Sequence, residues 1–194
     1  ERRVVGITSN SHKVIANLLL AACEAADESG ASLRALQLCV ADELVDHRFV
    51  EQAKNNGAVD EALAEGRIDL VTGTSWLWAR DEMRGSIDTL FIDEAGQVAL
   101  ANVLAVSPAA RNIVLLGDPQ QLDQPTHGVH PDGAGRSALA HFLGTAEVVP
   151  DDMGIFLEST WRMHPAITAY TSELFYEGQL RSVEEHGLER QSVA

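Results

Sequence analysis

The chain has 194 residues, of which 45% are hydrophobic and 22% charged, as in an ordinary globular protein of one domain, or of one domain and part of another. No apolar run approaches the roughly 18 residues of a membrane-spanning helix, so we expect no membrane-spanning segment and no membrane among the partners. The formal net charge of −15 excludes a nucleic-acid surface that depends on a general basic field, so any such contact must be local.

Two further features concern the origin of the chain. The cysteines Cys23 and Cys39 lie in apolar patterns and favour a reducing, cytoplasmic compartment. The chain opens on a strand-like segment without an initiator Met, so we expect a segment of a longer protein.

Short apolar runs alternate with helical patterns along the chain. Runs of strand type lie at residues 4–8, 36–40, 68–72, 90–92 and 112–116. Helices are expected after the first run as far as Gly30, and then over residues 42–65 with a break at 55–57, 97–106 and 137–143. This alternation is typical of an α/β fold with a mostly parallel sheet flanked by helices.

A domain boundary is expected near residue 150. A loop-like segment precedes it and contains His127 and His130, whose spacing suits a metal but more often belongs to an ordinary turn. A new strand is predicted over residues 155–158. A last helix follows, with apolar residues at Ile167, Tyr170, Leu174 and Phe175.

Polar clusters follow several of the predicted strands. They are Thr-Ser-Asn at 8–10, Thr-Gly-Thr at 72–74, Asp-Glu at 93–94 and Gly-Asp at 117–118. Right-handed crossovers bring the carboxyl ends of parallel strands to one edge of the sheet, where open α/β folds bind ligands. By themselves, Asp93 and Glu94 could either solvate a strand end or hold a metal ion.

The segment 117–122, Gly-Asp-Pro-Gln-Gln-Leu, resembles an element of superfamily-one helicases. In that family Asp-Glu-Ala-x ends one strand, Gly-Asp-x-x-Gln-Leu ends the next, and an aromatic-Arg-Met-His-Pro element follows. The same order occurs here at residues 93–96, 117–122 and 161–165, and residues 175–180 are similar to the Upf-like branch. The resemblance covers nearly the whole chain.

The resemblance implies a RecA-like P-loop NTPase fold that uses ATP and Mg²⁺. A partial first lobe would occupy residues 1–150, and the beginning of a second would occupy residues 151–194. The implied substrate is single-stranded DNA or RNA.

The same resemblance implies roles for residues that act on the nucleotide. Asp93 would hold the magnesium, and Glu94 would be the general base that polarises the attacking water. Gln121 would contact the γ-phosphate, for which an amide is suited. Asp118 would orient the metal shell or only cap its turn, and Arg162 is similar to an arginine finger.

Other side chains would bind bases or phosphates. Trp161 stands where the family usually has Tyr, and both stacking on a purine and a place in the core are open. Nucleic-acid contacts are implied for Thr8, Ser9, Asn10, Lys13, Thr74 and Ser75. Trp76 and Trp78 have the chemistry to stack on bases, but their i, i+2 spacing favours packing in the core.

The phosphate-binding sequence Gly-x-x-x-x-Gly-Lys-Ser/Thr does not occur in the 194 residues. We therefore expect a fragment of an ATP-dependent helicase or translocase that does not turn over ATP by itself. Residues 124–139 also look similar to a bacterial subgroup with a RecB-like nuclease domain in the same parent chain, which favours DNA.

Two alternatives remain. A superfamily-two helicase is disfavoured by Gln121, because that group has a short Ser/Ala/Thr element there. An inactive scaffold is disfavoured by the joint presence of Asp93, Glu94, Gln121 and Arg162.

Overall fold

The chain forms two units in a computed structural model that describes residues 3–39, 41–121 and 135–183. The first unit comprises Glu1–Asp118 and Leu122–Leu139, and the second comprises Pro119–Gln121 and Ala140–Ala194. The predicted assignment of two RecA-like lobes that meet near residue 150 stays a prediction. His127 and His130 lie outside the described residues.

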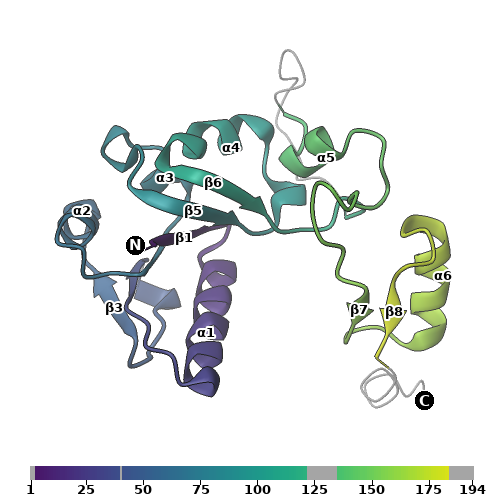
Figure 1. The fold of residues 1–194 in the computed structure, drawn as a ribbon, viewed down its shortest axis with the longest axis horizontal. Coiled ribbons are helices and arrows are strands. Elements are labelled where there is room, and N and C mark those ends of the chain that lie inside the picture. The colour runs from purple at the N-terminus through teal and green to yellow at the C-terminus, as the bar shows by residue number, and fades with distance from the viewer. Residues whose placement is uncertain (1–2, 40, 122–134, 184–194) are drawn as a thin grey trace. The chain divides into compact units, whose positions relative to one another are not determined.

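A six-stranded sheet forms the centre of the first unit (Figure 1). Its strands are β1 (Val5–Thr8), β2 (Ala35–Leu38), β3 (Val50–Ala53), β4 (Leu70–Thr72), β5 (Ile87–Ile92) and β6 (Ala110–Leu115). They are ordered β3-β2-β4-β1-β5-β6, and each neighbouring pair is parallel. All six carboxyl ends therefore lie at one edge, and the predicted α/β fold with a parallel sheet is confirmed.

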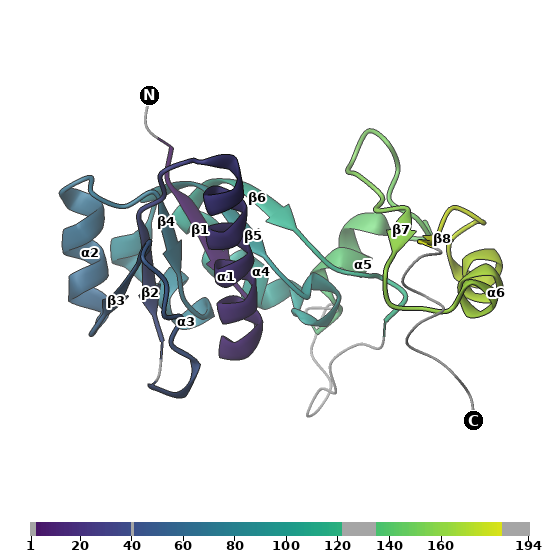
Figure 2. The ribbon, with the colours of Figure 1, turned by 90° about the horizontal axis from the view of Figure 1, so that it is seen from below.

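Helices cover both faces of this sheet (Figures 1 and 2). The helices and 3₁₀ turns are α1 (His12–Ser29), η1 (Ala41–Glu43), α2 (Asn56–Ala64), α3 (Ser75–Trp78), η2 (Asp81–Met83), η3 (Ala95–Gln97), α4 (Leu100–Val106), η4 (Ser107–Ala109) and α5 (Ala138–Leu143). Helix α1 buries Ile15 and Cys23 in one core, whereas α2, α3 and α4 contribute to the other. Adjacent strand residues alternate between the cores, with Leu70 in the first and Val71 in the second. As predicted, α1 ends at Gly30, which is left-handed with a φ of 69°.

The edge strand β3 shows that the prediction of a helix over residues 42–65 is wrong in its first half. That part contains η1 and β3, and only the later part forms α2. The sequence of β3 is Val-Glu-Gln-Ala, which lacks the apolar run that marks a central strand. Only Ala53 of its four residues is buried. The predicted break is confirmed, since the Asn55 side chain caps α2 by accepting the N–H of Ala58 at 3.0 Å.

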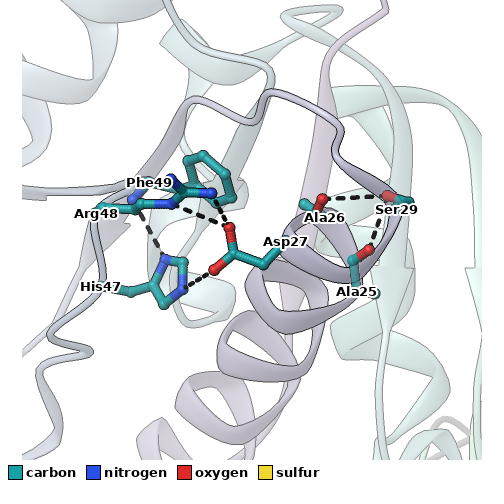
Figure 3. Close-up of polar contacts among 7 residues, drawn as sticks. All are labelled: Ala25, Ala26, Asp27, Ser29, His47, Arg48 and Phe49. Carbon is teal, nitrogen blue, oxygen red and sulfur yellow. Dashed lines mark hydrogen bonds and ion pairs between the residues drawn. The ribbon is translucent and has the colours of Figure 1, made fainter.

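A side-chain cluster near the end of α1 holds the segment that leads into β3 (Figure 3). The Asp27 carboxylate accepts a hydrogen bond from Arg48 Nε at 3.0 Å and lies 3.1 Å from His47 Nε2. The Arg48 guanidinium also lies over the Phe49 ring, 4.6 Å from its centroid. The hydrogen bond from Arg48 lowers the pKa of Asp27 below its ordinary value.

The two tryptophans of α3 have opposite environments. Trp78 is 1% exposed, and its Nε1 donates to the carbonyl oxygen of Gly73 at 3.1 Å. Trp76 is 86% exposed. The prediction of packing is confirmed for Trp78 and wrong for Trp76, because the short helix buries the side that carries Leu77 and Trp78.

Beyond the end of α5, which runs from the first unit into the second, the described residues of the second unit form a helix and a short parallel strand pair. These are α6 (Pro165–Phe175), β7 (Ser159–Thr160) and β8 (Arg181–Ser182). The strand predicted over 155–158 is wrong, since β7 begins at Ser159 and the apolar side chains of Ile155 and Leu157 are exposed.

Among the described residues, no helix is both long and apolar enough to cross a membrane.

Candidate functional site

The two acids predicted to serve the nucleotide directly follow β5. The backbone N–H of Asp93 donates to the carbonyl oxygen of Thr8 at 2.9 Å, which ties the end of β5 to the end of β1. Asp93 Oδ1 accepts the N–H of Glu94 at 2.9 Å, and both residues are half-buried. Glu94 is left-handed with a φ of 56°, a conformation that costs a non-glycine residue about 1–2 kcal/mol. The fold therefore holds Glu94 in a strained conformation at the carboxyl edge of the sheet.

Backbone contacts join the loop after β5 to the turn after β6. The N–H of Ala95 donates to the carbonyl oxygen of Leu116 at 2.8 Å. A Cβ atom on Gly96 would lie 2.7 Å from the carbonyl oxygen of Asp118, and one on Gly117 would lie 3.0 Å from the nitrogens of Ala95 and Gly96. The two loops touch backbone to backbone because both positions are glycine. Asp93, Glu94 and the half-buried Asp118 are therefore brought to one place.

The end of β1 presents its polar residues in two ways. Thr8 and Ser9 are buried, and their hydroxyl oxygens have no hydrogen-bond partner among the described residues. Thr72, on the neighbouring β4, has a buried hydroxyl of the same kind. Asn10 is exposed, and its Nδ2 donates to the carbonyl oxygen of Gln97 at 3.0 Å. Asn10 thus connects the expected nucleic-acid loop to the loop that carries Glu94, a link for which the sequence holds no signal.

The remaining candidates of the first unit lie at the starts of α1 and α3. Lys13 is exposed in the first turn of α1, where the N-cap residue Ser11 makes no side-chain capping bond. Thr74 and Ser75 are half-buried at the start of α3, directly after β4. A backbone bond from Gly73 to Ile7 at 3.2 Å places this segment next to the end of β1. The six residues expected to contact nucleic acid therefore lie at or after the carboxyl ends of two adjacent strands, β1 and β4.

The other nucleotide-site candidates belong to the second unit. Gln121 and Arg162 are exposed, and the backbone N–H of Arg162 donates to Thr160 Oγ1 at 3.3 Å. Trp161 is 58% exposed and is not part of a core. The approach of these three residues to Asp93 and Glu94 stays a prediction.

The acids at the carboxyl edge of the sheet have the donor chemistry that suits a magnesium–nucleotide complex. Within the part of the chain that the structure describes, no group of three or more His, Cys, Asp or Glu residues is arranged to hold a metal by itself. Magnesium in nucleotide sites needs only one or two carboxylates, because water and the phosphates complete its shell. Asp93, with Asp118 in the adjoining turn, provides hard oxygen donors of that kind.

Comparisons with known proteins point to the class of helicases with an AAA domain. A family model described as "AAA domain" matches residues 21–127, more than half of the chain. The "5'-3' DNA helicase ZGRF1" of Mus musculus is 32% identical over 93 residues, which cover 46% of this chain and 5% of the relative. The "Probable helicase MAGATAMA 3" of Arabidopsis thaliana is 31% identical over 96 residues, or 48% of this chain and 11% of the relative. Neither relative is described as a nuclease. The chain therefore belongs to the AAA-domain family found in Upf-like superfamily-one helicases.

Proposed function

We propose that the chain is the part of an ATP-dependent helicase or translocase that carries the water-activating and magnesium-binding acids. Its parent would move along single-stranded DNA or RNA at the expense of ATP. The observation that supports this best is the close packing of the Asp93–Glu94 loop on the Gly117–Asp118 turn at the carboxyl edge of the sheet.

In this proposal the two acids of β5 have separate tasks. Asp93 would hold the magnesium, either directly or through water, and Asp118 would orient that part of the site. Bound Mg²⁺–ATP would supply the polarised γ-phosphate. Glu94 would accept a proton from the attacking water, and its left-handed backbone fixes the direction in which its side chain leaves the main chain. Gln121 and Arg162 would contact the phosphates from the second unit, and Trp161 would stack on the purine.

The nucleic-acid side of the proposal uses groups that need little net charge. The first N–H groups of the 18-residue helix α1 receive no capping bond from Ser11, so they can donate to a phosphate. Lys13 lies in the same turn and adds one positive charge. Thr8, Ser9, Thr74 and Ser75 would supply hydroxyls, and Asn10 would link this contact to the loop of Glu94. These contacts suit a chain with a net charge of −15.

We favour DNA over RNA as the substrate, because one relative is named a DNA helicase. A RecB-like nuclease in the parent, and a cytoplasmic location, remain predictions about the whole protein.

The substitution Glu94→Gln in the full-length parent tests the assignment of the base. Since an amide cannot take the proton of the attacking water, the rate of nucleic-acid-stimulated ATP hydrolysis should fall by about 10²–10⁴-fold. The affinity for ATP, measured by titration with a fluorescent analogue, should be retained. Glu61→Gln, an exposed acid on α2, is the matched control and should leave both quantities unchanged.

Two results would contradict the proposal. Hydrolysis by the Glu94→Gln parent at the unmodified rate would show that another group is the base. Stimulated hydrolysis by the 194-residue chain alone would show that it does not need the missing phosphate-binding loop.

A further inference from the structure

Trp76 is an exposed tryptophan for which the proposed nucleotide chemistry has no use. Its side chain is 86% exposed, whereas Leu77 and Trp78 beside it are 2% and 1% exposed. Tryptophan is a large apolar side chain that stabilises a protein when it is buried. A fully displayed tryptophan therefore suggests a partner that covers its ring.

The protein holds this tryptophan on a rigid support. Trp78 Nε1 donates to the carbonyl oxygen of Gly73, and a Cβ atom on Gly73 would lie 2.6 Å from Leu77 Cδ2. The N–H groups of Leu77 and Ala79 donate to the backbone oxygens of Thr74 and Ser75, at 2.9 and 3.0 Å. Because Leu77 and Trp78, the two residues that follow it, are buried in the core, the backbone of Trp76 is held in place while its side chain stays exposed.

The position of Trp76 identifies the kind of partner. It directly follows Thr74 and Ser75, and its segment is bonded to the end of β1 through Gly73 and Ile7. Trp76 thus follows directly on residues that are proposed to contact a nucleic-acid backbone at this edge of the sheet. A nucleic acid whose phosphates contact Thr74 and Ser75 would pass next to Trp76.

From exposure, support and position we infer that Trp76 stacks on an unpaired base of the single-stranded nucleic acid. This inference rests on the proposed function and adds one base-binding residue to it. Stacking needs no positive charge, and every base has an aromatic face. It therefore supplies affinity that an acidic chain cannot obtain from a general basic surface. The adjacent cation, Arg80, is already paired with Asp60 at 2.6 Å.

Binding of labelled oligonucleotides to this chain, followed by fluorescence anisotropy at several salt concentrations, tests the inference. The probes are dT₂₀, rU₂₀ and an abasic strand of equal length that keeps the phosphates but lacks the bases. Trp76→Ala should bind dT₂₀ about 5- to 100-fold more weakly than the unmodified chain at every salt concentration. The salt dependence should not change, because stacking releases no counterions.

Matched variants separate stacking from other effects. Trp76→Phe keeps an aromatic face and should retain most of the affinity. Leu104→Ala removes an exposed side chain from α4 and should bind with the affinity of the unmodified chain. Trp76→Ala and the unmodified chain should bind the abasic strand with equal affinity. The rU₂₀ probe shows whether the stacked base is that of DNA, RNA or both.

The outcomes distinguish this inference from the proposed function. If Trp76→Ala bound each of dT₂₀ and rU₂₀ as tightly as the unmodified chain does, the stacking role would be overturned and the proposed function would stay in place. Failure of the unmodified chain to bind any single-stranded oligonucleotide would contradict both the inference and the proposed function. A loss for Trp76→Ala that also appears with the abasic strand would show a structural effect and overturn the inference.

Discussion

Two glycine residues decide whether the candidate site can form. Gly96 and Gly117 lie in separate loops, yet each faces backbone atoms of the other loop at about the distance where a Cβ atom would collide. Backbone cannot swing aside as the end of a flexible side chain can. The approach of Asp118 to the loop of Asp93 and Glu94 therefore depends on the absence of two methyl groups.

Gly96→Ala is expected to destabilise the chain by about 1–3 kcal/mol, since the added Cβ would lie 2.7 Å from the carbonyl oxygen of Asp118. Urea unfolding followed by circular dichroism measures this loss. Gly57→Ala in α2 is the matched control, because its Cβ meets only the Asn55 side chain at 3.3 Å and helices favour alanine over glycine. Equal stability of Gly96→Ala and the unmodified chain would show that the two loops are not packed this closely.

At the scale of elements, predictability from sequence follows the range of the interactions that form each element. The strands β1 and β4 and the helix α1 are predictable because their own apolar pattern identifies them. The edge strand β3 is not, because it is polar and is held by residues distant in the chain. Its Gln52 side chain donates to Gln37 Oε1 at 3.0 Å, and the preceding Arg48 binds Asp27.

Asp27→Asn is expected to lower the urea midpoint of unfolding at pH 6 slightly, since the Arg48 guanidinium stabilises the ionised carboxylate. The pKa of Asp27 is lowered in the folded chain, so this stabilisation is present above the unfolded value near 3.8. It is lost as the pH falls through the lower folded value, and the difference between Asp27→Asn and the unmodified chain should shrink accordingly. Asp81→Asn, at a side chain that is 97% exposed, should leave the urea midpoint nearly unchanged both at pH 6 and in acid. A difference for Asp27→Asn that grows on acidification would contradict the assigned pairing.

At the scale of the whole molecule, the candidate site is predictable only in part. Strand-end motifs indicate which residues reach the carboxyl edge of the sheet, and the meeting of Asp93 and Glu94 with Asp118 follows from the order of the strands. Whether an apolar side chain is exposed is harder to predict from sequence, because an apolar pattern does not reveal whether other elements form a core against it. The helix α6 illustrates this limit, since its described buried residues are Thr168 and Ser172 rather than its large apolar ones.

The exposed apolar side chains of α6 lead to a stability prediction. Leu174 is 48% exposed, so Leu174→Ala should cost less than about 1 kcal/mol in the unfolding transition of the second unit. Leu90 is fully buried in the sheet of the first unit, and Leu90→Ala should cost about 2–5 kcal/mol there. Urea unfolding of both variants measures the contrast, with Leu104→Ala as an exposed leucine of the first unit for control. A loss for Leu174→Ala as large as that for Leu90→Ala would mean that this face of α6 is covered in solution. Repeating the measurement at several protein concentrations would then show whether a second copy of the chain covers it.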